Sequence, residues 1–195
     1  AAPAWDAQSM KTYMASLALT APESMGFLKG ATLYGGALNG RPTGSIAGVT
    51  SPSPDQTWIS VGAAIPTPVE GLAVGIAWDH LYIPNQTGIS ADDTDALAGY
   101  IDYKVTEKLT AHTRFDYIKV GGNGLAGGGD IITGGTAFAP GDQFFTTTVT
   151  LDYSLWQNII SRAEFRWDHD LGANGGGHFG GYPAGGEDDD FLLAL

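Results

Sequence analysis

One stretch of the chain decides its fold class: Ile159-Ile160-Ser161-Arg162-Ala163-Glu164-Phe165-Arg166-Trp167-Asp168. Every second residue is apolar or small, and the residues between them are charged from Arg162 onward. This period of two is typical of a β-strand with two different faces, whereas an amphipathic helix repeats every three to four residues. The stretch therefore predicts a strand with one apolar face and one charged face.

The same alternation recurs along the chain in segments of about ten residues. It is clearest in Gly71 to Asp79, Leu109 to Tyr117 and Gln143 to Tyr153. Weaker versions run over Thr12 to Ala21, Gly26 to Gly35, Thr57 to Ile65 and Leu97 to Val105, and Phe191 to Leu195 begins a further one. We therefore expect about eight strands and the start of a ninth.

The connections between these segments alternate in length. Short turns are expected at Ala21 to Ser24, Pro66 to Glu70, Thr106 to Lys108 and Ser154 to Gln157. Long loops rich in Gly, Pro, Asn and Asp are expected at Gly36 to Gln56, Tyr82 to Asp95, Gly121 to Asp142 and His169 to Asp190. Short turns at one end and long loops at the other are typical of an outer-membrane β-barrel, with periplasmic turns and extracellular loops. A soluble sandwich has no reason to place every long loop at one end.

The two faces of the strands differ in the solvent they can tolerate. A row such as Arg162, Glu164, Arg166 and Asp168 cannot fill a dry core, because unpaired buried charges cost several kcal/mol each. The charged face must therefore see water. The opposite face is apolar and carries aromatic residues near both ends, as the girdles of a transmembrane barrel do. The expected girdle residues are Trp78, Tyr103, Tyr117, Phe145, Tyr153 and Trp167.

The composition excludes several classes of protein. The 195 residues include no cysteine, so there is no disulfide, no cysteine-based metal site and no thiol nucleophile. A net charge of −12 argues against nucleic acid as a partner, because phosphate binding needs a basic surface. No apolar run approaches the roughly 18 residues of a membrane helix, and Ala1 to Trp5 lacks the features of a signal peptide.

Two motifs of this sequence are similar to motifs of a known family: Arg162 to Asp170, preceded by Leu155 to Asn158, and Lys108 to Tyr117. The sequence resembles the beta-barrel porins of type 2 of Gram-negative outer membranes. In that family the first motif is the late-strand signature and the second is the preceding hairpin. The resemblance covers mainly Ala96 to Asp170. It implies an all-β fold, a transmembrane antiparallel up-and-down β-barrel or the contiguous part of one. The family's barrels have more strands, and Leu195 is not the terminal aromatic usual in outer-membrane proteins. We therefore expect residues 1–195 to be a single domain and a portion of a larger barrel, and the order of their elements fits its C-terminal half.

The resemblance implies a porin, a water-filled channel for passive diffusion of small hydrophilic solutes and ions, embedded in outer-membrane lipid and lipopolysaccharide. It suggests a homotrimer. The acidic stretches Asp92-Asp93 and Glu187 to Asp190 favour a weak cation preference. Opposite charges on neighbouring strands would form a transverse field, although the same residues can equally form salt bridges that stiffen the wall. The residues expected to line the pore are Asp79, Asp102, Lys104, His112, Arg114, Asp116, Asp152, Arg162, Glu164, Arg166 and Asp168.

Other motifs favour no cofactor, no metal and no enzyme. Gly122 to Gly127 matches G-x-G-x-x-G but continues into more glycine rather than a helix. Glu187 to Asp190 could hold calcium, yet a solvated charge run explains it better. His80, His112, His169 and His178 lack metal-site spacing and are expected to be hydrogen-bonding wall residues. Two other functions stay open: a non-conducting structural, adhesin or scaffold barrel that holds a partner, and a soluble ligand-binding barrel with an apolar interior.

Overall fold

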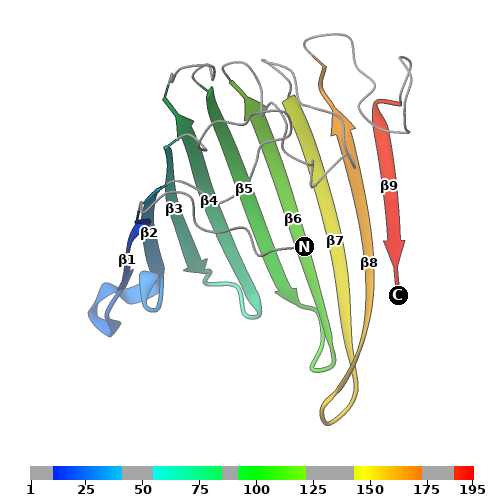
Figure 1. Ribbon diagram of the computed structural model, residues 1–195. Helices are drawn as coiled ribbons and strands as arrows, with labels where there is room; N and C mark the ends of the chain where they lie inside the picture. Colours follow the sequence, from blue (N-terminus) through cyan, green and yellow to red (C-terminus); the bar gives the residue numbers. More distant parts are fainter. Residues whose placement is uncertain (1–10, 41–54, 85–91, 122–142, 173–186) are drawn as a thin grey trace, which may run out of the picture.

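The computed structural model describes residues 11–40, 55–84, 92–121, 143–172 and 187–195. They form one antiparallel sheet of nine strands, in which each strand pairs with its neighbours in the sequence (Figure 1). The strands are β1 (Tyr13–Thr20), β2 (Thr32–Gly40), β3 (Gln56–Pro66), β4 (Leu72–Ile83), β5 (Asp92–Lys104), β6 (Leu109–Val120), β7 (Gln143–Trp156), β8 (Ile159–Asp170) and β9 (Asp189–Ala194). The expected all-β up-and-down topology is confirmed.

The described connections all lie at one end of the sheet (Figure 1). Three of them are short, as expected: residues 67–71, 105–108 and 157–158. The fourth, between β1 and β2, is longer than predicted because it contains a 3₁₀ helix, η1 (Glu23–Leu28). The prediction that a strand begins at Gly26 was therefore wrong by six residues. Most of the expected long loops and the motif at Gly122 to Gly127 lie outside the described residues.

The last turn is also tighter than expected. Strand β7 continues to Trp156 through a register irregularity after Ser154, and only Gln157 and Asn158 form the turn. Asn158 has φ 69°, a left-handed conformation that asparagine tolerates better than most residues. The predicted turn at Ser154 to Gln157 was therefore too long, because Leu155 and Trp156 belong to the strand.

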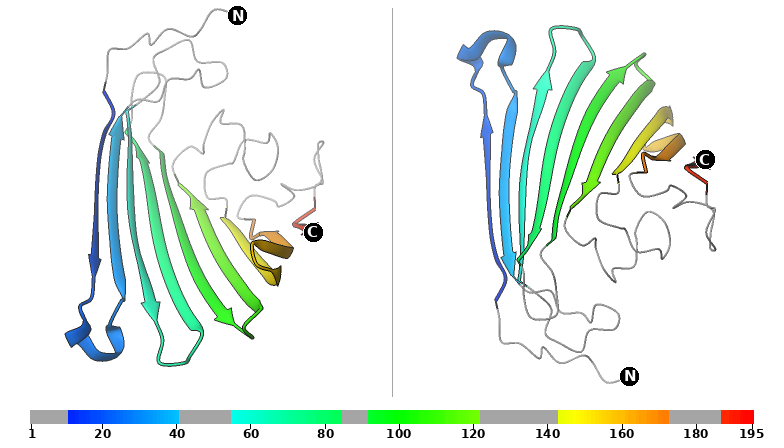
Figure 2. Two further views of the ribbon diagram at one scale, coloured as in Figure 1. Left: turned by 90° about the horizontal axis from the view of Figure 1, so that it is seen from below. Right: turned by 90° about the horizontal axis from the view of Figure 1, so that it is seen from above.

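The middle strands are long enough to cross a membrane. Strands β4 to β8 have 12 to 14 residues each, and a tilted transmembrane strand needs about 9 to 11. The sheet curves into an open trough, with β1 and β9 at its two edges (Figure 2). Among the described residues β1 and β9 do not pair with each other, so the sheet is not an eight-stranded closed barrel.

The sheet has almost no interior. Among the described residues only five hydrophobic side chains are buried, and they include Val120 and Phe144 near the ends of β6 and β7. Large apolar side chains are instead exposed on every strand, for example Leu17, Ile76 and Phe165. The ladder of backbone hydrogen bonds between strands, rather than a packed core, holds this fold together. No helix in the described part of the chain is both long and apolar enough to cross a membrane.

Candidate functional site: the charged face of the sheet

All eleven residues expected to line a pore lie on one face of the sheet, which we call the charged face. The strand registers place them there: Asp102 pairs with His112, Asp152 with Arg162, and Asp116 with Thr146, which pairs with Asp168. Because residues directly opposite each other point the same way, these pairings and the alternation within each strand fix the face of every member. The charged residues come from β4 to β8.

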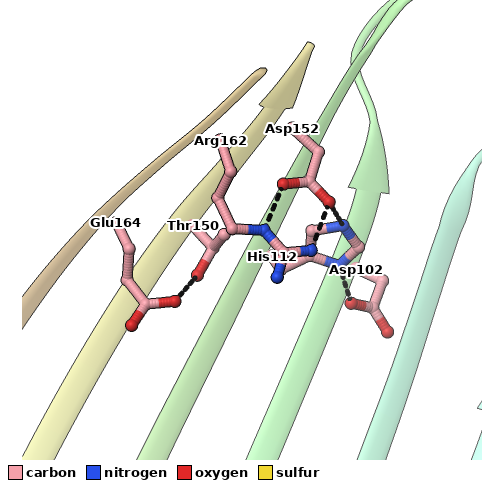
Figure 3. Close-up of polar contacts among 6 residues, drawn as sticks. All are labelled: Asp102, His112, Thr150, Asp152, Arg162 and Glu164. Atoms are coloured by element: carbon pink, nitrogen blue, oxygen red, sulfur yellow. Dashed lines mark hydrogen bonds and ion pairs between the residues drawn. The ribbon is translucent and has the colours of Figure 1, made fainter. Parts of the chain in front are cut away.

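A chain of polar contacts crosses four strands of the charged face at the end with the short turns (Figure 3). His112 Nδ1 on β6 lies in hydrogen-bonding contact with Asp102 on β5. Its other ring nitrogen, Nε2, is 3.8 Å from Asp152 Oδ2 on β7. Arg162 on β8 donates two hydrogen bonds to Asp152, from Nε at 2.7 Å and from Nη2 at 2.8 Å. Acidic and basic groups therefore alternate across the sheet.

A second arrangement repeats on β6 and β8. Arg114 Nε lies 2.8 Å from Asp116, and Arg166 Nε lies 2.8 Å from Asp168, so each arginine pairs with the aspartate two residues further along its own strand. The expectation that these pairs cross neighbouring strands was wrong for both. The pairs form within a strand because residues two apart share a face and long arginine side chains can reach along it. Among the described residues, the expected pairing of an arginine across strands holds for Arg162 and Asp152.

The remaining predicted residues have other surroundings. Glu164 accepts a hydrogen bond from Thr150 at 2.9 Å rather than facing an arginine. Asp168, which is buried, also accepts one from Thr146 at 2.6 Å. Asp79 accepts a hydrogen bond from Ser60, and within the described residues neither Asp79 nor Lys104 has an ion pair. The charged face therefore carries both paired and unpaired charges.

The six expected girdle residues lie on the opposite face, which we call the apolar face. Tyr103 and Tyr153 are near the short turns, each about two-fifths exposed. Near the other end, Trp78, Tyr117 and Phe145 belong to one row of directly opposed residues, and Phe145 contacts Trp167 edge to face at 6.2 Å. The aromatic residues thus border the apolar face at both ends.

Sequence reasoning missed a repeated cluster on the apolar face. Asp95 Oδ1 accepts a hydrogen bond from Trp78 Nε1 at 3.0 Å and contacts His80 Nδ1 at 2.9 Å. Asp189 Oδ1 makes the same two contacts, with Trp167 at 2.7 Å and His169 at 2.8 Å. The tryptophan and histidine rings contact each other in both copies, stacked for Trp78 and His80 and tilted for Trp167 and His169, with centroids 5.6 and 5.5 Å apart.

The signal for this cluster was the tripeptide Trp-Asp-His, which occurs at residues 78–80 and again at 167–169. Its aspartate points to the charged face and its tryptophan and histidine to the apolar face. His80, His112 and His169 make hydrogen-bonding contacts, as expected, although His80 and His169 lie on the apolar face and His112 on the charged face. The expectation of a solvated charge run at Glu187 to Asp190 changes, because Asp189 is hydrogen-bonded to two side chains. His178 lies outside the described residues. No group of potential metal ligands occurs in the described ranges.

Comparison with known proteins agrees with this two-faced sheet. Residues 11–194 match the family model described as "Putative beta-barrel porin-2, OmpL-like". The chain belongs to this family. The match to the porin-2 model extends well beyond the Ala96 to Asp170 segment in which the resemblance was first seen.

A solved structure supports the barrel-like fold. The chain is similar to a loop L8 deletion mutant of OmpT, an outer membrane protein of Vibrio cholerae, with a TM-score of 0.53 and 11% sequence identity. The similarity covers 93% of this chain and 52% of that one, so the chain spans about half the length of the solved barrel. A search among curated proteins finds no match.

Proposed function

We propose that this chain forms part of the wall of an outer-membrane porin, a water-filled channel through which small hydrophilic solutes and ions diffuse passively. The observation that carries the proposal is the separation of the two faces. Between the ends of the strands, the charged residues project to one face and the apolar residues to the other. A single Lys or Arg facing lipid at the middle of a bilayer costs about 2 to 4 kcal/mol. Water on the charged face and lipid on the apolar face are the arrangement that avoids this cost.

The exposure of the apolar face supports the same arrangement. Leu17, Ile76 and Leu151 are between 43% and 62% exposed. In a soluble ligand-binding barrel such side chains would be enclosed around the ligand. In a membrane they contact lipid tails, and the aromatic residues at both borders lie at the headgroups. We therefore place the protein in the outer membrane of a Gram-negative bacterium, in contact with lipid and lipopolysaccharide, with no catalytic role.

A complete channel requires that the sheet be closed. The edges of an open sheet carry unpaired backbone groups, which hydrocarbon cannot satisfy. Within the described residues, β1 pairs with β2 only and β9 with β8 only, so each of them has one unpaired edge. We propose that these edges pair with further strands of a larger barrel, and that barrels of this kind assemble as trimers.

The charges on the charged face favour cations. In the described strands, carboxylates outnumber Lys and Arg there by eight to four. The carboxylates are Asp79, Asp102, Asp116, Asp152, Glu164, Asp168, Asp170 and Asp190, and the cationic residues are Lys104, Arg114, Arg162 and Arg166. Fixed charges along a pore raise the concentration of ions of opposite sign. A weak preference for cations is expected.

Planar-bilayer recording of the purified full-length protein tests this proposal. Stepwise increases in current are expected after insertion, and a reversal potential under a salt gradient should show cation preference. Insertion without conductance would contradict the channel and favour a structural, adhesin or scaffold barrel. A protein that stays in solution without detergent would contradict the membrane location altogether.

A further inference from the structure

A hollow of about 500 Å³ lies on the charged face over β2 to β5, and it shares Asp102 with the polar network. Its floor consists of small residues, among them Gly62, Gly75 and Ala77. Tyr34 on β2 and Tyr100 on β5 stand at its two sides. Three strand spacings of about 4.8 Å separate the two tyrosine-bearing strands, or about 14 Å in all. The floor of small residues lies between these two strands.

The glycines keep the floor of the hollow flat. A Cβ atom added at Gly75 would lie 3.5 Å from Cδ2 of Tyr100, so the tyrosine ring rests beside the bare backbone of Gly75. A Cβ atom added at Gly62 would lie 3.1 Å from the carbonyl oxygen of Ile76, closer than almost any real contact of this kind. Larger residues at these positions would push into the space between the tyrosines.

The polar groups of the hollow are mainly negative. Asp79 and Asp102 both line it. Asp79 accepts a hydrogen bond from Ser60, and Asp102 contacts His112, but neither pairs with Lys or Arg in the described ranges. The nearest guanidinium, that of Arg114, lies over the Tyr100 ring at 5.5 Å and is hydrogen-bonded to Asp116. The hollow therefore combines aromatic sides, an apolar floor and two carboxylates that form no ion pair with Lys or Arg within the described residues, although Asp79 also interacts electrostatically with Arg114.

We propose that this hollow is a binding subsite for organic cations, solutes that carry a protonated amine on an apolar body. An aromatic face attracts a cation, the carboxylates supply the opposite charge, and the floor of small residues accommodates the apolar part. An anionic solute would be repelled by the two carboxylates. This inference rests on the proposed porin function, since it names the class of solute that the channel wall would retain during passage.

Three ring compounds that differ in charge test the proposal on the full-length protein: benzylamine, benzyl alcohol and benzoate. Binding is measured by isothermal titration calorimetry in detergent, and interruptions of the ionic current are recorded in planar bilayers. Benzylamine, protonated at pH 7, is expected to bind and to interrupt the current. Benzyl alcohol should bind several-fold more weakly, and benzoate should not bind.

Two substitutions in the hollow have a matched control outside it. Tyr34→Ala and Asp79→Asn should each weaken benzylamine binding about fivefold, the range expected for one cation–π contact or one ion pair. Glu164→Gln removes one negative charge from the same face but lies outside the hollow, so it should change benzylamine binding less than twofold. Heat-induced mobility shifts in gels show whether each variant is folded.

The outcomes separate the subsite from the channel. Equal weakening in Asp79→Asn and Glu164→Gln would overturn the subsite, because it would show a general effect of charge. Equal binding of benzylamine and benzyl alcohol would overturn the assignment to cations. Calorimetric binding without any conductance would support the subsite and contradict the porin function, whereas conductance without binding would do the reverse.

Discussion

At the scale of single residues, the charged face depends on short-range ion pairs whose main effect is on charge rather than on stability. Arg162 is exposed over 63% of its side chain although it holds Asp152 with two hydrogen bonds. Exposed ion pairs contribute about 0 to 1 kcal/mol to folding, because water screens them and ordering the side chains costs entropy. For ion selectivity, the position of each charge on the wall therefore matters more than the contribution of its ion pair to folding stability.

Arg162→Gln tests whether the ion pair between Arg162 and Asp152 acts mainly on the charge of the wall. The substitution leaves Asp152 without its cationic partner and adds one net negative charge to the charged face. We expect a shift of the reversal potential toward stronger cation preference and almost no change in the free energy of unfolding, because exposed ion pairs contribute little to folding. Arg162→Lys keeps the charge and serves as the control. Loss of folding in Arg162→Gln with unchanged selectivity would show that the pair mainly stiffens the wall.

At the scale of elements, the strands were predictable and several of their ends were not. The alternation at Leu109 to Tyr117 and at Ile159 to Asp168 marks β6 and β8 from their first residue. The predicted β6 ended three residues early, because Ile118 and Val120 continue its charged face with apolar side chains. The predicted β8 ended two residues early, at Asp168. The start of β2 was predicted six residues early, because Gly26 and Gly30 have positive φ, which interrupts an extended strand.

Gly71 tests the turn between β3 and β4. Its φ is +79°, and a Cβ atom there would lie 3.1 Å from the carbonyl oxygen of Lys104. Gly71→Ala should destabilise the protein by about 1 to 2 kcal/mol, because a left-handed conformation is unfavourable for alanine. Urea unfolding in detergent, followed by tryptophan fluorescence, measures the change. Gly99→Ala is the control, since nothing lies within 4 Å of the added atom and its φ is ordinary; equal losses in both variants would contradict the assignment.

Asp189 tests the pairing of β9 with β8. Asp189→Ala removes the acceptor for both Trp167 and His169 and should weaken the pairing of β9 with β8. Faster hydrogen exchange of the β9 amides, with unchanged exchange in β5 and β6, is the expected result. In Asp188→Ala the backbone bond from Asp170 N to the carbonyl of residue 188 is retained, so exchange should stay as in the unchanged protein. Uniformly faster exchange across the sheet would mean that the effect is not local to this cluster.

At the scale of the whole molecule, the sequence was sufficient to assign every predicted pore-lining and girdle residue to a face. A period of two leaves only two choices for each strand, and charge decides between them. The contacts between side chains on one face were harder to predict from the sequence. The hydrogen bonds of Asp95 and Asp189, and the hollow between Tyr34 and Tyr100, depend on register and on the small residues between strands, which alternation alone does not specify.

Cysteine scanning tests the arrangement of the whole sheet, because the chain has no cysteine of its own. Strand β7 offers four consecutive positions: Thr148 and Thr150 on the charged face, and Val149 and Leu151 on the apolar face. In intact outer membranes, a small charged thiol reagent should label cysteine at 148 and 150 and leave 149 and 151 unlabelled, because it enters water but not lipid. After denaturation in detergent all four should react equally. Labelling that is uniform along the four positions would show that the apolar face also contacts water, which would exclude the membrane-spanning wall and, with it, the channel.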